Sequence, residues 1–154
     1  MKKIIKDDLI IKEIHLEELN TMIDSYIQYF NQNEMMTWNQ ETVTKKFRQL
    51  VLREDYVGLG LYNKQTLIGF AVGALIQFDD GIIAHLNEIF VDGTYQSKGL
   101  GSKLLKSFED LVKSKGAFRI QLETTKDEIH QRFYNHYHDY LDTNTHLIKG
   151  KQLK

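Results

Sequence analysis

The sequence contains no cysteine and no proline, and its formal net charge is only −1. Without cysteine there is no disulfide, no cysteine-ligated zinc site and no thiolate nucleophile. A charge this close to zero does not mark the chain as a nucleic-acid-binding protein. No apolar run approaches the length of a membrane-spanning helix, and Met1–Asp8 lacks the apolar core of a signal peptide. A cytoplasmic protein with neither a nucleic-acid nor a membrane partner is therefore expected.

What is present is typical of one ordinary globular domain. The chain has 154 residues, of which 42% are hydrophobic and 27% charged, which is enough to form a sizeable core. No repeat, linker or low-complexity tract interrupts it. We therefore interpret residues 1–154 as a single domain.

Apolar spacing predicts the order of the secondary structure. Alternating or continuous apolar runs predict strands over 8–14, 56–62, 67–78, 82–91, 118–123 and 145–153. Spacings of three and four residues predict helices over 15–32, 39–53, 100–115 and 128–137, with Gly116 ending the third. This order predicts an α+β, or mixed α/β layer, fold around one sheet.

One loop between a predicted strand and a predicted helix is rich in small residues. Val91–Leu105 reads V-D-G-T-Y-Q-S-K-G-L-G-S-K-L-L. The first N–H groups of a helix lack internal acceptors and favour an anion, and Gly99 and Gly101 let a ligand approach the backbone closely. Lys98 and Lys103 add positive charge. The loop is therefore predicted to bind an anionic group; the alternative is that its glycines only begin the helix.

Two common phosphate-binding motifs do not match this loop. A P-loop would need glycine at Lys98, and a dinucleotide fingerprint would need glycine at Leu104. Neither an ATPase nor an NAD enzyme is predicted.

A third motif does match. Gln96–Gly101, Q-S-K-G-L-G, resembles the Q/R-x-x-G-x-G/A signature of the GNAT family of N-acetyltransferases, with the strand end Phe90-Val91 before it and the pair Phe133-Tyr134 on a later helix. The resemblance implies one GNAT-like domain, with a central, mostly antiparallel sheet whose fourth and fifth strands splay apart and helices on both faces. It also implies an acetyl-CoA-dependent N-acetyltransferase, and a homodimer, because many relatives pair through sheet edges.

The resemblance assigns acetyl-CoA, as co-substrate, to this loop and to the strand before it. Loop amides would hold the pyrophosphate, and the pantetheine arm would pair with the strand edge like an added strand. Asp127 stands where the family commonly has asparagine before the tyrosine helix. The implied cofactor-binding residues are Ile89, Phe90, Val91, Gln96, Ser97, Lys98, Gly99, Leu100, Gly101, Ser102 and Asp127.

Direct acetyl transfer to an amine requires a base, and Glu88 is the first candidate. It lies within the apolar strand H-L-N-E-I-F-V, where desolvation would raise the pKa of a carboxylate. The alternatives are a structural acid paired with a lysine or arginine, or a residue facing solvent. His85 is the alternative base, although simple alternation places it on the opposite face of the strand. By resemblance, Tyr134 is the candidate acid for the leaving thiolate; the alternative is core packing.

The acceptor is expected to be a primary amine of a small molecule. The resemblance assigns the acceptor site to the first helices and their connection, Asn31–Trp38, where Glu34 beside Trp38 would receive a cationic amine. Alternatively, Met35, Met36 and Trp38 only pack the corner between helices.

No metal is expected, because no Asp/Glu pair completes a site with His130, His136, His138 and His146. The competing functions are a non-catalytic acyl-CoA-binding or regulatory module, suggested by altered residues after Tyr134, and a protein N-acetyltransferase.

Overall fold

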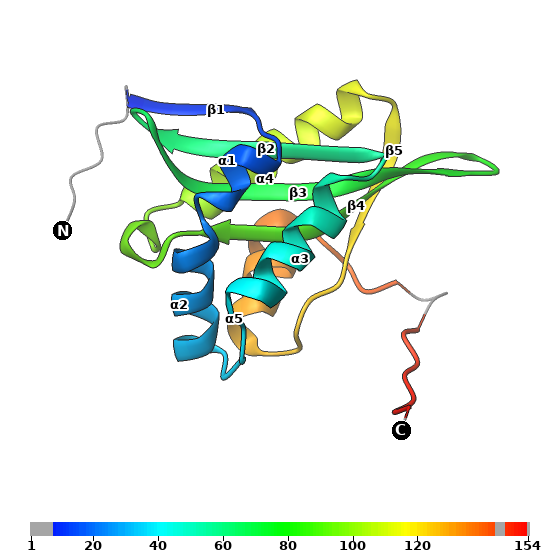
Figure 1. Ribbon diagram of the computed structural model, residues 1–154. Coiled ribbons are helices and arrows are strands. Elements are labelled where there is room, and N and C mark those ends of the chain that lie inside the picture. Colours follow the sequence, from blue (N-terminus) through cyan, green and yellow to red (C-terminus); the bar gives the residue numbers. More distant parts are fainter. Residues whose placement is uncertain (1–7, 144–146, 154) are drawn as a thin grey trace. The chain divides into compact units, whose positions relative to one another are not determined.

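The computed structural model of the protein describes residues 8–143 and 147–153. Contacts divide the chain into two units, Met1–Glu123 and Thr124–Lys154, and each is considered by itself. The first unit is built on a five-stranded sheet with the strand order β1-β2-β3-β4-β5 (Figure 1). These strands are β1 (Leu9–Glu13), β2 (Tyr56–Asn63), β3 (Thr66–Phe78), β4 (Gly81–Val91) and β5 (Ala117–Leu122).

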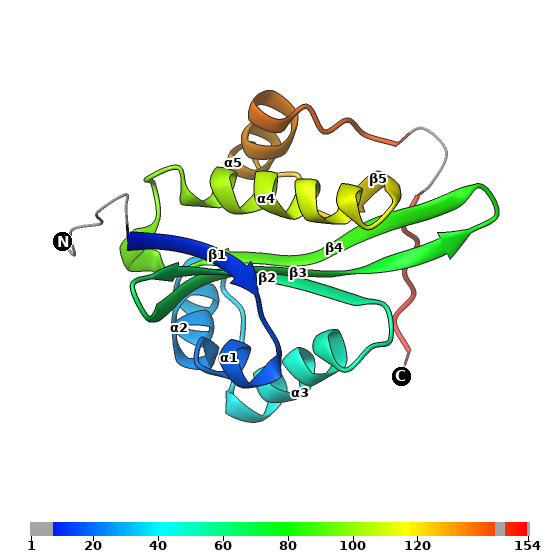
Figure 2. The same cartoon turned by 90° about the horizontal axis from the view of Figure 1, so that it is seen from above.

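The sheet is mostly antiparallel, as the resemblance implies. Strands β1 to β4 pair antiparallel with their neighbours, and only β5 runs parallel to β4. Helices α1 (Leu16–Asn20), α2 (Ile23–Asn33) and α3 (Gln40–Val51) cover one face, and α4 (Leu100–Ser114) covers the other (Figure 2). The expected α+β architecture, with helices on both faces, is therefore confirmed.

The predicted helix over 15–32 is in fact two helices. The chain leaves the helical path at Thr21 and Met22, where the Thr21 hydroxyl donates to the Glu18 carbonyl oxygen at 2.6 Å. A threonine hydroxyl competes with backbone hydrogen bonds in this way, which favours a break. The next helix, α3, begins after Asn39, whose side-chain oxygen accepts a hydrogen bond from the Thr42 amide at 2.9 Å.

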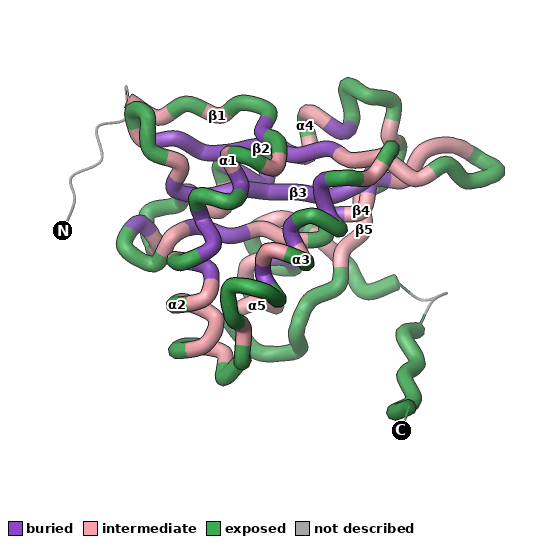
Figure 3. The backbone as a smooth tube through the Cα atoms, in the orientation of Figure 1, coloured by how far each residue is buried: buried purple, intermediate pink, exposed green. Residues whose placement is uncertain are grey.

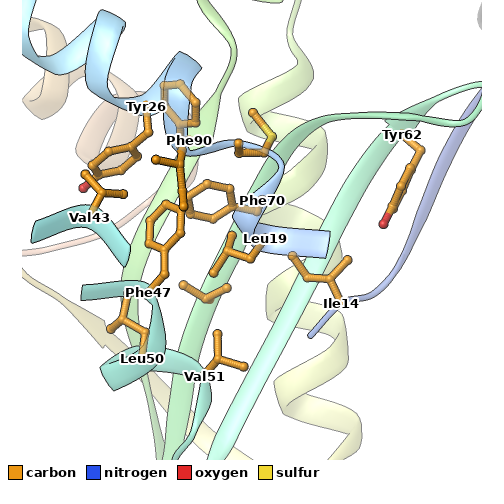
Figure 4. Close-up of a cluster of buried hydrophobic side chains, with 13 residues drawn as sticks. Ile14, Leu19, Tyr26, Val43, Phe47, Leu50, Val51, Tyr62, Phe70 and Phe90 are labelled. Atoms are coloured by element: carbon orange, nitrogen blue, oxygen red, sulfur yellow. The ribbon is translucent and has the colours of Figure 1, made fainter. Parts of the chain in front are cut away.

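The main hydrophobic core lies between the sheet and α1 to α3. Buried residues concentrate in the central strands and on the inner sides of these helices (Figure 3). Aromatic rings fill the part of the core nearest α2: Tyr26, Phe47, Phe70 and Phe90 pack together at its centre (Figure 4). On the opposite face, α4 buries one apolar stripe and is capped at Lys115. Gly116 follows the cap with a φ of 98°, which confirms the predicted helix end.

The second unit contains less regular structure. Helix α5 (Glu128–Gln131) continues into a π-helical turn, η3 (Arg132–Tyr137), so the predicted helix over 128–137 is present with a wider final turn. The predicted strand over 145–153 is wrong for 147–153, which carry no regular structure; residues 145 and 146 lie outside the described residues. No helix within 8–143 or 147–153 is both long and apolar enough to cross a membrane.

Candidate active site

A β-bulge in β4 shapes the region around Glu88. Val72 of β3 pairs with Glu88, but the next residue, Gly73, pairs with Leu86, so Asn87 is an extra residue on β4. A Cβ atom built at Gly73 would lie 2.0 Å from the carbonyl oxygen of His85. Only glycine permits this close approach of the two backbones, and an isolated glycine in a strand is the sequence signal for such a bulge.

The bulge corrects the prediction for His85. Residues that pair directly across antiparallel strands share a face of the sheet. Val72 pairs with Glu88 and Ala74 pairs with His85, and β3 is regular between these two residues. His85 therefore lies on the same face as Glu88, because the extra residue reverses the alternation between them.

Glu88 is partly buried and forms a hydrogen bond with a tyrosine of α2. The Tyr26 hydroxyl donates to the Glu88 Oε1 atom at 3.1 Å. Burial raises the pKa of the Glu88 carboxyl above its ordinary value, and Glu34 adds to this rise through charge repulsion. The Lys46 ammonium and the Tyr26 hydrogen bond oppose the rise. The result is a carboxylate with increased basicity, a property suited to accepting a proton from an amine.

One edge of β4 is open beyond the bulge. Among the described residues, β4 pairs with β5 only as far as Leu86, opposite Leu122, which is the expected divergence of these two strands. The Asp92 amide donates to the Ile68 carbonyl of β3 at 2.8 Å. Since backbone groups alternate in direction along a strand, those of Ile89 and Val91 point to the other, open edge. A ligand with amide groups could pair with this edge like an added strand.

The loop after β4 is tied to this edge by Gln96. The Gln96 Nε2 atom donates to the Val91 carbonyl oxygen at 2.8 Å. Before it, the short helix η2 (Gly93–Tyr95) is capped by Asp92, whose Oδ1 atom accepts from the Thr94 amide at 2.9 Å. The Gln96 side chain thus has a structural role at the base of the predicted anion loop.

The glycine loop leaves the beginning of α4 open. Gly99 is the N-cap residue of α4, with a left-handed backbone (φ 75°) and no side chain to cap the helix. A Cβ atom built there would have no heavy atom within 4 Å, and Ser97, Lys98 and Gly99 are exposed. An anion that approached the first amides of this fifteen-residue helix would meet no Cβ atom at Gly99. The binding of a pyrophosphate group at this loop stays a prediction.

The connection between α2 and α3 is held by Asn31. Its Oδ1 atom accepts from the Trp38 amide at 2.9 Å, and its Nδ2 atom donates to the Trp38 carbonyl at 2.8 Å. Trp38 contacts the core, with its ring centroid 5.9 Å from that of Tyr26. Met35 is 93% exposed, so the interpretation that it packs the helix corner is wrong. A cleft of about 550 Å³ lies beside Asn31 and Trp38, large enough for a small molecule.

The remaining predicted residues belong to the second unit. Tyr134 is buried, with its ring centroid 4.9 Å from that of Phe133 and 5.7 Å from that of Tyr140. Asp127 is the N-cap residue of α5 and accepts from the His130 amide at 2.9 Å. Hydrogen bonds from the Thr125 hydroxyl and this amide lower the Asp127 pKa. The catalytic role of Tyr134 and the cofactor-binding role of Asp127 stay predictions.

Two features of the site were missed by sequence reasoning. The pairing of Tyr26 with Glu88 joins residues 62 positions apart, and no local pattern could reveal it. Lys46 acts on Glu88 from α3, where its spacing is that of an ordinary surface lysine. The residues that the structure describes contain no group of three or more His, Cys, Asp or Glu side chains arranged to hold a metal ion.

Comparison with known proteins points in one direction. Residues 19–140 match the sequence profile of the Acetyltransferase (GNAT) family. The spermine/spermidine N(1)-acetyltransferase of Bacillus subtilis (strain 168) is 34% identical over 109 residues, which cover 64% of this chain and 71% of the relative.

Solved structures share the fold at low sequence identity. A possible acetyltransferase from Clostridium difficile 630 has a TM-score of 0.79 and 15% identity, covering 95% of this chain and 99% of that one. An aminoglycoside acetyltransferase from an uncultured soil metagenomic sample, in complex with sisomicin, has a TM-score of 0.72 and 15% identity, covering 96% and 98%.

Proposed function

Since this chain belongs to the GNAT family of acetyltransferases, we propose that it transfers the acetyl group of acetyl-CoA directly to a primary amine of a small polyamine. The observation that carries the proposal is Glu88. It is a partly buried carboxylate of raised pKa, held by Tyr26, at the bulge where the open edge of β4 begins. The expected anion loop comes directly after β4 in the chain and leads into the beginning of α4.

The proposed role of each part follows from its chemistry. The amides of Gln96–Ser102 hold the pyrophosphate of acetyl-CoA, and the open edge at Ile89–Val91 pairs with the pantetheine arm. Glu88 accepts a proton from the ammonium form of the acceptor, directly or through water, because only the free amine has a lone pair. The amine nitrogen then bonds to the acetyl carbon, the carbon–sulfur bond breaks, and the nitrogen gives up a second proton, which through water restores the proton that Tyr134 donates. From its place in the family pattern, Tyr134 is assigned the role of the acid that donates a proton to the leaving thiolate.

Two observations support a polyamine as the acceptor. Glu34 acts on both Glu88 and Tyr26 through its negative charge, while Lys46 acts on Glu88 with the opposite sign and more strongly. Two carboxylates therefore stand against one ammonium around the base, which leaves a carboxylate to pair with a cationic acceptor. The curated relative at 34% identity is a spermine/spermidine acetyltransferase. A substrate with several ammonium groups would place one amine at Glu88 and a second near Glu34.

Thiol release on adding amines tests the proposal. The chain has no cysteine, so a thiol-reactive dye reports only the CoA produced. Spermidine and spermine are expected to be turned over, with an aminoglycoside and a lysine peptide as comparison acceptors. Glu88→Gln is expected to lower kcat/KM by about a hundredfold or more, the usual contribution of a general base. His85→Gln is the matched control, since it changes the other basic group on this face.

The outcomes separate the candidate functions. Turnover that survives Glu88→Gln but not His85→Gln would transfer the role of base to His85. Turnover of the lysine peptide alone would favour a protein N-acetyltransferase. Stabilisation of the protein by acetyl-CoA, with no thiol release from any amine, would favour a non-catalytic acyl-CoA-binding module. The single domain over residues 1–154 and the homodimer stay predictions.

A further inference from the structure

The hydroxyl of Tyr26 donates a hydrogen bond to the proposed base, Glu88. We propose that Tyr26 is a positioning residue, whose hydroxyl holds the Glu88 carboxylate in the orientation in which it accepts the proton of the amine. This inference rests on the proposed function of Glu88 as the base. It assigns to α2 a part in the reaction beyond forming the acceptor region.

Tyr26 is held more rigidly than a surface tyrosine. Its side chain is only 2% exposed, and aromatic rings surround it on several sides (Figure 4). Its ring centroid lies 4.5 Å from that of Phe30, 5.3 Å from that of Phe47 and 5.6 Å from that of Phe90. A ring packed in this way cannot swing away from the sheet, so the position of its hydroxyl is determined by the core.

The hydrogen bond has one direction throughout the working pH range. Burial, followed by the negative charge of Glu88, raises the pKa of Tyr26 well above its ordinary value. Tyr26 therefore remains protonated and donates, while Glu88 accepts through Oε1. In this arrangement the second carboxylate oxygen, Oε2, is the atom that accepts the proton of the amine. A tyrosine that cannot lose its own proton positions the base and does not relay protons itself.

The same bond adjusts the basicity of Glu88 among the charged groups around it. Lys46 of α3 and the Tyr26 hydroxyl both lower the pKa of Glu88, whereas burial and Glu34 raise it. His85 lies on the same face of β4. The hydroxyl stabilises the carboxylate form of Glu88 and so lowers its pKa. Removing the hydroxyl leaves the opposite effect of burial in place, and the pKa of Glu88 moves upward.

The test is Tyr26→Phe, which removes the hydroxyl and keeps the ring. The ratio of its kcat/KM for spermidine to that of the wild type is measured across pH, because the titration of the amine cancels in the ratio. A hydrogen bond to a charged group is typically strong enough for about a tenfold loss. We expect a loss of this size at low pH. The acid limb, which is the low-pH side of the curve of kcat/KM against pH, is expected to move up by about one pH unit. An acid limb that stays at the wild-type pH would overturn the inference.

A second tyrosine provides a matched control for the loss of a hydrogen-bonded tyrosine hydroxyl. Tyr56 donates to the Ile14 carbonyl oxygen at 2.6 Å and packs against the same core, but its bond does not involve Glu88. Tyr56→Phe is expected to lower the melting temperature and to leave the acid limb in place. Equal shifts of the acid limb in both variants would mean that Tyr26 acts only through general stability.

A double-mutant cycle separates this inference from the proposed function. If Tyr26 acts through Glu88, Tyr26→Phe has no further effect on kcat/KM in the Glu88→Gln protein. Full activity of Glu88→Gln alone would remove the proposed base itself. Loss of activity in Glu88→Gln, with an unchanged pH profile in Tyr26→Phe, would overturn only the role of Tyr26.

A fluorinated side chain covers the case in which Tyr26→Phe does not fold. A monofluorinated tyrosine at this position keeps the ring and the hydroxyl and makes the hydroxyl a stronger donor. The acid limb is then expected to move to lower pH, opposite to the shift for phenylalanine. No shift would contradict the inference.

Discussion

Gly99 allows the anion-binding role of the loop to be tested apart from folding. Its backbone is left-handed, at φ 75°, and a Cβ atom built there has no heavy atom within 4 Å. Gly99→Ala therefore costs only the strain of a left-handed alanine, about 1 kcal/mol after the gain from a less flexible unfolded chain. In a domain of this size, that lowers the melting temperature by about 2–4 °C.

Gly116 is the matched control for this change. It too has a left-handed backbone, at φ 98°, and an added Cβ atom would meet only the Ile82 side chain at an ordinary 3.7 Å. Gly116→Ala should therefore destabilise the protein to a similar degree. It lies at the opposite end of α4 from the loop, where it cannot obstruct an anion at the first amides of the helix.

The two variants should differ in their response to acetyl-CoA. At about one hundred times its Kd, the ligand stabilises the folded wild type by about 2.7 kcal/mol. A methyl group that removes one amide–phosphate hydrogen bond costs about 2 kcal/mol, or about thirtyfold in Kd. At the same concentration, the stabilisation of Gly99→Ala then falls to about 0.9 kcal/mol. Thermal melting with and without acetyl-CoA measures this difference. Equal ligand-induced shifts in the two variants would refute the placement of the pyrophosphate at this loop.

Three further predictions concern the rest of the site. Burial raises the pKa of Glu88 in the folded state, so the stability that its protonated form contributes is lost as pH rises through that pKa. Glu88→Gln should accordingly melt at a higher temperature than the wild type near pH 7.5, with a difference that shrinks below about pH 4; a pH-independent difference would contradict this. Asn31→Ala loses both hydrogen bonds to Trp38, and steady-state kinetics should show a raised KM for the amine with an unchanged KM for acetyl-CoA. Asp127→Ala should speed hydrogen exchange of the His130 amide at neutral pH, whereas Asp127→Asn should preserve its protection, because asparagine also caps helices; equal exchange in both variants would count against the cap.

The regular elements of the first unit were largely predictable from short-range patterns. The spacing in Leu100–Lys115 predicts the buried stripe of α4, and Gly116 predicts its end, because a helix ends where a left-handed residue is inexpensive. The helix break at Thr21 was missed because the apolar spacing continues through it. The Thr21 hydroxyl favours the break by competing for a helix carbonyl oxygen, and apolar spacing does not report such a bond. The strand expected over 145–153 is not formed at 147–153, and residues 124–143 and 147–153 contain no strand with which it could pair.

Some features of the candidate site follow from local sequence patterns, and others depend on contacts between distant parts of the chain. The sequence by itself determined the family resemblance, the loop Gln96–Ser102 and the choice of Glu88, because residue type and spacing within one segment carry this information. Tertiary structure alone decided that Tyr26 bonds to Glu88 and that His85 shares its face. The first depends on a helix packing onto a strand far away in the chain, and the second depends on one extra residue in a pairing register, which no single strand can specify without its partner.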